Sequence, residues 1–134
     1  MNVIRPGNHG STFGGNPIAA AVAMAALEVV ADEKLAINAD RLGKIFRAEL
    51  SEFCKENDLV KSVRGKGLLN AILINDTEDS STAWDICIKL RDNGLLAKPT
   101  HGNIIRFAPP LVMTEEELRD CIGIIKNTIS DFNR

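Results

Sequence analysis

Aromatic residues and basic clusters are both scarce in this sequence, and their scarcity argues against nucleic-acid binding. The 134 residues include five Phe, one Trp and no Tyr, and the formal net charge is -2 with a pI near 5.7. Lys and Arg are scattered along the chain. No basic stripe with interleaved aromatic rings, of the kind that binds nucleic acid, is therefore present. We expect no nucleic-acid partner.

Long hydrophobic runs are also missing. The longest, Ile18–Ala26, is rich in alanine and falls short of the ~20 apolar residues that a membrane-spanning helix needs. Residues 1–7 do not follow the pattern of a signal peptide, which has a charged start and then an apolar centre. The sequence predicts no membrane association.

Cysteine is sparse, and the three that occur stand far apart in apolar, helix-like surroundings: Cys54, Cys87 and Cys121. An odd number without Cys-x-x-Cys or His-x-x-x-His spacing favours neither disulfides nor a metal site. Reduced, buried thiols are typical of a cytosol-like compartment. We therefore expect a cytoplasmic protein that holds no metal.

The N-terminal part predicts a glycine-rich loop followed by an apolar helix. Asn16 is a suitable N-cap, and Pro17 can occupy the first helical position because its missing N–H has no helical partner there. The helix is expected to run to about Val30. Because it is apolar nearly all round, it needs burial against larger bodies. In this chain alone it should expose apolar surface and favour self-association.

The rest of the sequence predicts a small α+β domain with helices covering an antiparallel or mixed sheet. Asp32 is expected to cap a helix that ends near Glu56, with apolar residues at helical spacing. The other expected elements are strands Leu59–Val63 and Leu68–Ile74, a helix Thr82–Asn93, and a hairpin of Leu95–Lys98 with Ile104–Phe107.

The last helix carries the clearest local signal. Thr114 and Glu117 have the spacing of a capping box, and Met113 with Leu118 that of a hydrophobic staple. The expected apolar stripe of this helix comprises Leu118, Cys121, Ile122, Ile125, Ile129 and Phe132.

The loop between Pro6 and Pro17 is the first candidate site. Its glycines let backbone N–H groups approach an anion, and Ser11 and Thr12 add hydroxyl donors just before a helix. Contact with a phosphate is one interpretation. A tight loop that simply needs glycine is the other, and the residues alone leave both open.

Arg106 is the second candidate, because apolar residues flank it on a predicted strand. A partly buried guanidinium needs a carboxylate or phosphate, and its planar fork suits a carboxylate. An edge-strand arginine that points at water is the alternative. Arg64–Gly67 could touch an acidic ligand, but a solvated turn between strands explains it better. His9 and His101 lie in glycine-containing loops, where a structural or exposed role is expected.

Four segments together resemble a known family. His9–Pro17 is similar to the loop that class III (fold type I) aminotransferases place near their cofactor. Arg64–Ala71, Leu90–Gly102 and Ile105–Leu111 resemble the ornithine aminotransferases in particular. The resemblance implies the C-terminal portion of such an enzyme, with a cofactor-facing loop and connecting helix at 1–31 and a small C-terminal α+β domain at 32–134.

The resemblance also implies roles for three residues. Ser11 and Thr12 match positions that reach the phosphate of pyridoxal 5'-phosphate held by the other subunit of a homodimer or higher oligomer, with Thr12 the better match. Arg106 matches the arginine that binds the α-carboxylate of the substrate or oxo acid. The resemblance to the ornithine aminotransferases implies an activity that moves the δ-amino group of ornithine to 2-oxoglutarate, giving glutamate semialdehyde and glutamate.

In this family the cofactor-binding lysine lies upstream of the glycine loop. Neither Lys66 nor Lys98 stands at the matching position, so we expect the isolated chain to be inactive and to bind no cofactor covalently. Two alternatives stay open: another class III aminotransferase acting on a neighbouring ω-amino substrate, and a non-catalytic module that binds an anion or a partner.

Overall fold

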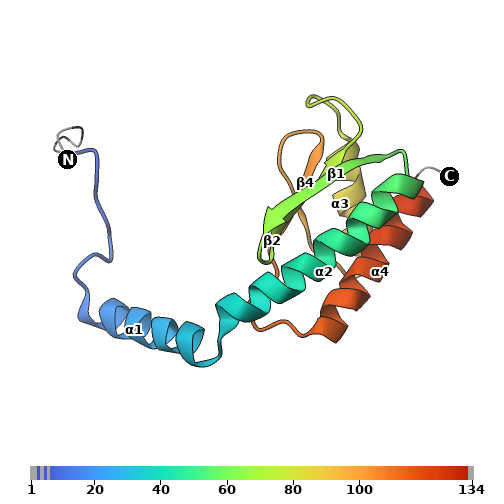
Figure 1. The fold of residues 1–134 in the computed structure, drawn as a ribbon. Coiled ribbons are helices and arrows are strands. Elements are labelled where there is room, and N and C mark those ends of the chain that lie inside the picture. Colours follow the sequence, from blue (N-terminus) through green and yellow to red (C-terminus); the bar gives the residue numbers. More distant parts are fainter. Residues whose placement is uncertain (1–2, 4, 6, 133–134) are drawn as a thin grey trace. The chain divides into compact units, whose positions relative to one another are not determined.

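The computed structural model describes residues 3, 5 and 7–132. These residues form two compact units, Met1–Leu35 and Ala36–Arg134 (Figure 1). The first is a loop with one helix, and the second is a sheet with three helices.

Helix α1 (Pro17–Asp32) makes up most of the first unit. The side chain of Asn16 accepts hydrogen bonds from the backbone N–H groups of Ile18 and Ala19, at 2.9 and 3.1 Å, which confirms the predicted cap. The expectation for Asp32 was wrong: it is the last residue of α1 and does not cap the next helix. The helix continues through Asp32 because the backbone N–H of Glu33 still donates to Val29, at 3.0 Å.

No side chain of α1 is buried. Its exposed large apolar residues are Ile18, Val22, Met24, Leu27, Val29 and Val30. The predicted exposure of apolar surface is therefore confirmed. A helix with so little internal packing depends on contacts with other surfaces for its stability.

The second unit contains a four-stranded sheet with the strand order β1-β2-β4-β3. The strands are β1 (Val60–Lys66), β2 (Leu69–Ile74), β3 (Lys98–Pro99) and β4 (Ile104–Phe107). All neighbouring strands pair antiparallel, so of the two predicted sheet types the antiparallel one is correct. The hairpin of β3 and β4 is confirmed, although β3 is shorter than predicted.

Strand β1 extends further than the sequence indicated. Arg64, Gly65 and Lys66 were expected in a turn, but they pair in register with Ala71, Asn70 and Leu69 of β2. Only Gly67 and Leu68 remain between the strands. Two basic side chains thus lie on a strand of the sheet and not in a solvated loop.

Three helices accompany the sheet: α2 (Leu35–Glu56), α3 (Thr82–Asp92) and α4 (Glu115–Phe132). They share one hydrophobic core with alternate residues of the strands. Fully or nearly fully buried members include Leu42, Phe46, Leu50, Ile72, Ile74, Ile86, Leu90, Ile105, Leu118, Ile122, Ile125 and Ile129. The predicted stripes of α2 and α4 are confirmed, with Cys121 and Phe132 only partly buried.

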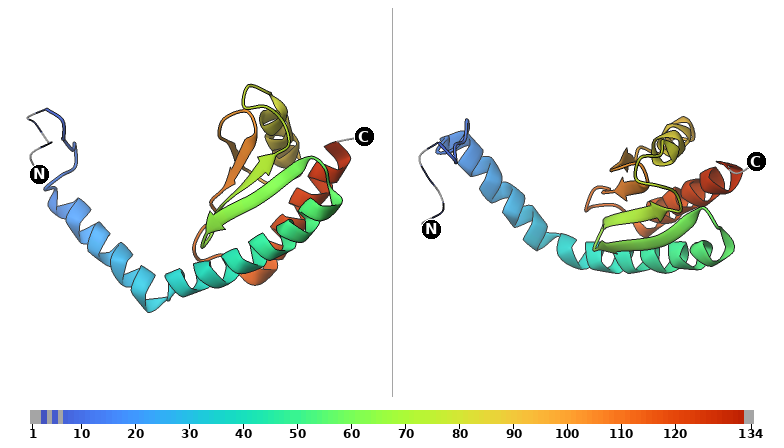
Figure 2. Two further views of the ribbon diagram at one scale, coloured as in Figure 1. Left: turned by 45° about the horizontal axis from the view of Figure 1, so that its top comes forward. Right: turned by 90° about the horizontal axis from the view of Figure 1, so that it is seen from above.

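Helices α2 and α4 lie side by side and run in the same direction (Figure 2). Ion pairs join Arg41 to Glu115 near their starts, and Glu49 to Arg119 and Lys126 further along. All of these groups are at least partly exposed, so the pairs add little stability and mainly fix the register of the two helices.

The start of α4 has the predicted capping box. The backbone N–H of Thr114 donates to the carboxylate of Glu117 at 2.8 Å, and the N–H of Glu117 donates to the hydroxyl of Thr114 at 3.3 Å. These two bonds satisfy N–H groups that have no partner within the helix.

Helix α3 ends at Asp92, and Gly94 follows with a φ of 90°, in the left-handed region that favours glycine.

Candidate functional site

The glycine-rich loop before α1 presents Ser11 and Thr12 to solvent. Neither hydroxyl has a hydrogen-bond partner among the residues that the structure describes. A Cβ added at Gly10, next to Ser11, would meet nothing within 4 Å, whereas one at Gly14 would come within 3.2 Å of the Ser11 hydroxyl oxygen. The loop is therefore open to an approaching group on the Gly10 side. The loop therefore offers free donors of the kind that a phosphate accepts.

The N-terminus of α1 itself is less available than the sequence suggested. Asn16 already occupies the N–H groups of Ile18 and Ala19 with its side-chain oxygen. An anion at this loop would consequently be held by hydroxyls and loop N–H groups, with a smaller contribution from the first turn of the helix.

Arg106 lies on β4, between β2 and β3, and so does not belong to an edge strand. Its neighbours Ile105 and Phe107 point into the core. The side chain of Arg106 is exposed, which corrects the expectation of partial burial. Alternation along the strand is the reason, because residues on either side of a buried position face the opposite side of the sheet.

Arg106 borders a shallow groove of about 310 Å³ on this face of the sheet. The groove brings it together with Arg64 and Lys66 of β1. Its other lining residues are Gly65, Leu69, Asn70 and Ala71. A guanidinium at an open groove can receive a carboxylate from solution through two parallel hydrogen bonds.

A buried hydrogen-bond network fixes the turn beside this groove. Arg47 of α2 donates to the carbonyl oxygen of Gly67 at 3.1 Å and to the side-chain oxygen of Asn70 at 2.8 Å. The amide nitrogen of Asn70 donates to the same carbonyl at 3.0 Å. Asn70 is only 2% exposed, so its hydrogen bonds are needed to offset its burial. Sequence spacing could not reveal this network, because Arg47 lies 20 and 23 positions from its two partners.

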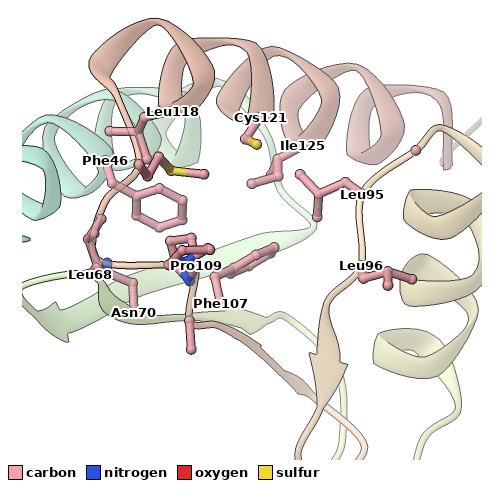
Figure 3. A pocket seen from close by; sticks show the side chains of 14 residues that line it. Phe46, Leu68, Asn70, Leu95, Leu96, Phe107, Pro109, Leu118, Cys121 and Ile125 are labelled. Atoms are coloured by element: carbon pink, nitrogen blue, oxygen red, sulfur yellow. The ribbon is translucent and has the colours of Figure 1, made fainter. Parts of the chain in front are cut away.

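A second hollow, also of about 310 Å³, lies on the opposite, helix-covered side of the sheet. Its lining is mainly apolar, and Figure 3 shows Leu118, Cys121 and Ile125 of α4 pointing toward the ring of Phe107. The rings of Phe46 and Phe107 have their centroids 5.7 Å apart, at 53°. Only Asn70 contributes a polar side chain to this lining besides the Cys121 thiol. The hollow lacks the convergent polar groups of a catalytic site.

The three cysteines are free thiols. Burial raises the pKa of Cys87 to about 11, and it also raises the pKa values of Cys54 and Cys121. Thiols with raised pKa values are poor nucleophiles near neutral pH. Among the described residues no group of three or more His, Cys, Asp or Glu side chains could hold a metal ion.

The two histidines lie in loops, His9 in the glycine-rich loop and His101 in the second unit. His9 and His101 are both exposed, and His101 has a φ of 58° in the tight loop between β3 and β4.

None of the described helices is long and apolar enough to cross a membrane.

The chain matches one family model over residues 1–129, that of the class-III aminotransferases. It is 58% identical to the mitochondrial ornithine aminotransferase of Rattus norvegicus over 132 residues, and 60% identical to that of Drosophila melanogaster over 129 residues. These alignments cover 98% and 96% of this chain. The chain spans about 29% of the length of each of these curated relatives.

Solved structures agree with these matches. The acetylornithine aminotransferase of Elizabethkingia anophelis superposes with a TM-score of 0.88 at 67% identity, covering 98% of this chain and 34% of that one. The ornithine δ-aminotransferase of Plasmodium falciparum gives a TM-score of 0.84 at 47% identity, with the same coverage. The similarity thus extends over both units of the chain.

Proposed function

Because the chain belongs to the class-III aminotransferases, we propose that a protein containing it transfers the δ-amino group of ornithine to 2-oxoglutarate. The products are glutamate semialdehyde and glutamate. The observation that carries the proposal is the exposed Arg106 at an open groove, in a chain 58% identical to an ornithine aminotransferase. A guanidinium fork free for a carboxylate is what both the amino donor and the oxo acid require.

The loop at residues 7–17 fits the phosphate of pyridoxal 5'-phosphate. Thr12 and Ser11 have hydroxyls without partners in the described chain, and Gly10 leaves space beside Ser11. When bound, this cofactor supplies the electron-withdrawing ring through which an amino group passes between two carbon skeletons. Thr12 would donate its hydroxyl hydrogen bond to a phosphate oxygen, and Ser11 would assist it.

Arg106 would orient the substrate by its α-carboxylate. Two parallel hydrogen bonds from a planar guanidinium fix both the position and the rotation of a carboxylate, so the reacting end of the substrate is held at a constant place. In the second half-reaction the same fork would bind the α-carboxylate of 2-oxoglutarate. The neutral small side chain of Ala71, paired with Arg106 across β2 and β4, leaves room for that carboxylate.

The covalent and proton-transfer steps of the transamination would be carried out by residues outside this chain. In the family that the chain resembles, the lysine that binds the cofactor precedes the glycine loop. The 134 residues would therefore contribute Thr12 to a cofactor held by the other subunit of a dimer, and Arg106 to the substrate pocket. By themselves they would be inactive.

Steady-state kinetics of the full-length protein test the amino donor. We expect ornithine to be transaminated with 2-oxoglutarate far faster than N-acetylornithine. A preference for N-acetylornithine would replace the proposed donor by its α-N-acetylated form while retaining the family's chemistry. Absence of turnover with both donors would leave the anion-binding module as the better description.

Cofactor retention tests the role of the loop. In the full-length protein, Thr12→Val removes the hydroxyl while keeping the shape of the side chain. We expect faster loss of pyridoxal phosphate during dialysis, followed by absorbance, with a smaller effect for Ser11→Ala. Equal retention by wild type and Thr12→Val would remove Thr12 from the phosphate site.

We propose a cytoplasmic location because the three cysteines are free thiols, as is usual in a reducing compartment. Immunolocalisation of the protein in its source cells tests this directly. A mitochondrial signal, as the name of the Rattus norvegicus relative states for that protein, would replace the proposal.

A further inference from the structure

Arg106 is one member of a row of basic side chains that crosses the whole sheet. Arg64 pairs with Ala71, Ala71 pairs with Arg106, and Arg106 pairs with Lys98. Directly paired residues project from the same face of a sheet. At about 4.8 Å per strand, the Cα atoms of Arg64 and Arg106 are roughly 10 Å apart, and Lys98 stands one strand beyond.

We call Arg64, Lys66, Lys98 and Arg106 the cationic row. Lys66 is included because it lies two residues after Arg64 on β1, opposite Leu69, and so projects from the same face of the sheet. All four side chains are exposed. None has an ion pair or side-chain hydrogen bond with another described residue.

Several arginines elsewhere in the chain differ in this respect. Arg41, Arg91 and Arg119 each pair with a carboxylate, and Arg47 donates to Gly67 and Asn70. No carboxylate forms an ion pair with the cationic row among the described residues. Asp40, whose pKa Lys66 helps to lower through its charge, pairs with Lys44 instead. The positive charge of the row is therefore left for a group that comes from outside.

The groove gathers three members of the row. Arg64, Lys66 and Arg106 line it together, and no Asp or Glu is among its described lining residues. Leu69 and Ala71 form an apolar part of the same lining. Charges of one sign at a concave surface with apolar walls focus the electrostatic field, and this raises the local concentration of ions of opposite charge.

We propose that Arg64, Lys66 and Lys98 guide the dianionic oxo acid toward Arg106 and disfavour the approach of the cationic amino donor. The inference rests on the proposed function, whose two substrates carry opposite net charge near neutral pH. 2-Oxoglutarate is a dianion, whereas ornithine has two ammonium groups and one carboxylate. One groove thus attracts one substrate and repels the other.

The three guiding residues act on Arg106's substrate through the field, and Arg106 itself makes the contact. Guidance needs charge but no particular hydrogen-bond geometry. A lysine at position 64 should therefore function nearly as well as arginine. At position 106 it should not, because the bidentate fork is lost.

The test uses the full-length enzyme at low ionic strength. We expect Arg64→Gln combined with Lys66→Gln to lower kcat/KM for 2-oxoglutarate about tenfold, the lower end of the range for electrostatic steering. kcat at saturating oxo acid should stay within about twofold, and kcat/KM for ornithine should be unchanged or raised. In ~1 M salt, where the Debye length is ~3 Å, the difference in kcat/KM should nearly vanish.

Two variants serve as controls. Arg64→Lys keeps the charge and should behave as wild type. Lys55→Gln removes one positive charge from the exposed surface of α2, where Lys55 pairs with Glu52 at 2.8 Å. It should leave kcat/KM for 2-oxoglutarate unchanged. Circular dichroism and Tm show whether each variant is folded.

Binding of glutarate, an unreactive five-carbon dianion, is measured by calorimetry on the same proteins. This second readout does not depend on turnover, so an enzyme inactive with ornithine overturns the proposed function and still tests the row. Weaker, salt-sensitive glutarate binding in the double variant supports the inference. A change below twofold in both readouts would overturn it. So would an effect that persists in high salt, or an Arg64→Lys variant as impaired as the double variant, because either result indicates a specific contact.

Discussion

The two units of the chain differ in where their stability comes from. The second buries a continuous set of apolar side chains contributed by α2, α3, α4 and the sheet. The first contains an apolar helix, α1, that buries none. Burial of apolar area is the main favourable term in folding. The second unit therefore contains the determinants of its own fold, whereas α1 and its loop rely on surfaces that these residues do not supply.

The difference fits the proposed roles of the two units. A loop that reaches a cofactor in a neighbouring subunit must present free donors, and Ser11 and Thr12 do so. An arginine that receives a mobile carboxylate needs a rigid support. Arg106 has one, because Ile105 and Phe107 on either side of it are fixed in the core.

Truncating one apolar side chain in each unit should give the largest contrast. Ile72→Ala removes a fully buried side chain and should cost about 2–5 kcal/mol of unfolding free energy in the 134-residue chain. Leu27→Ala removes a side chain that is 70% exposed, and should change it by less than ~0.5 kcal/mol. Urea denaturation followed by circular dichroism measures both. Equal losses would mean that α1 packs in solution as a part of the core.

The network at the turn between β1 and β2 gives the next largest effect. Asn70→Ala removes one hydrogen bond from Arg47 and one from the carbonyl of Gly67, which keep only the bond to each other, and should cost about 1–3 kcal/mol. Arg91→Ala is the matched control, because Arg91 pairs only with Asp92 at an exposed position. If the two variants have the same Tm, the network does not support the sheet.

The cap of α1 tests the independence of the first unit. Asn16→Ala should destabilise the start of α1 by about 1 kcal/mol, since two N–H groups lose their acceptor. Amide hydrogen exchange should then rise in residues 18–25 and stay unchanged in α2, α3, α4 and the sheet. Faster exchange in the core as well would show that the units are energetically coupled.

The smallest effect concerns pH. Hydrogen bonds to Glu117, first from the backbone N–H of Thr114 and then from its hydroxyl, lower the pKa of the Glu117 carboxyl. A lowered folded-state pKa means that the carboxylate stabilises the fold above its ordinary unfolded pKa of roughly 4.3. This contribution is lost as the pH falls through the folded-state pKa. The Tm difference between wild type and Glu117→Gln should therefore shrink on acidification, and a constant difference from neutral to strongly acidic pH would contradict the assignment.

Local signals predicted much of this fold. The cap at Asn16, the capping box at Thr114 and the apolar stripes of α2 and α4 depend on residues within a few positions of one another, so sequence spacing is enough to find them. The alternation of Ile105, Arg106 and Phe107 was also enough to predict that Arg106 faces away from the core. The apolar neighbours were instead interpreted as a sign that Arg106 itself is partly buried.

Features that depend on strand register could not be predicted in this way. Gly65 pairs with Asn70 in the ladder, and a Cβ at Gly65 would come within 2.3 Å of the side-chain oxygen of Asn70, so this strand position needs glycine. Sequence spacing indicated a turn there. The alignment of Arg64, Arg106 and Lys98 in one row likewise appears only once the strand order and pairing are known.

We propose that Arg106 of the second unit binds the α-carboxylate of the oxo acid through both arms of its guanidinium. Steady-state kinetics of full-length Arg106→Lys with 2-oxoglutarate test it most directly, with Arg64→Lys as the matched substitution on the same face of the sheet. Loss of a charge-assisted bidentate contact of about 1.5–3 kcal/mol should lower kcat/KM roughly ten- to hundredfold, while Arg64→Lys stays near wild type. Unchanged kinetics for Arg106→Lys would remove Arg106 from the substrate site and contradict the account.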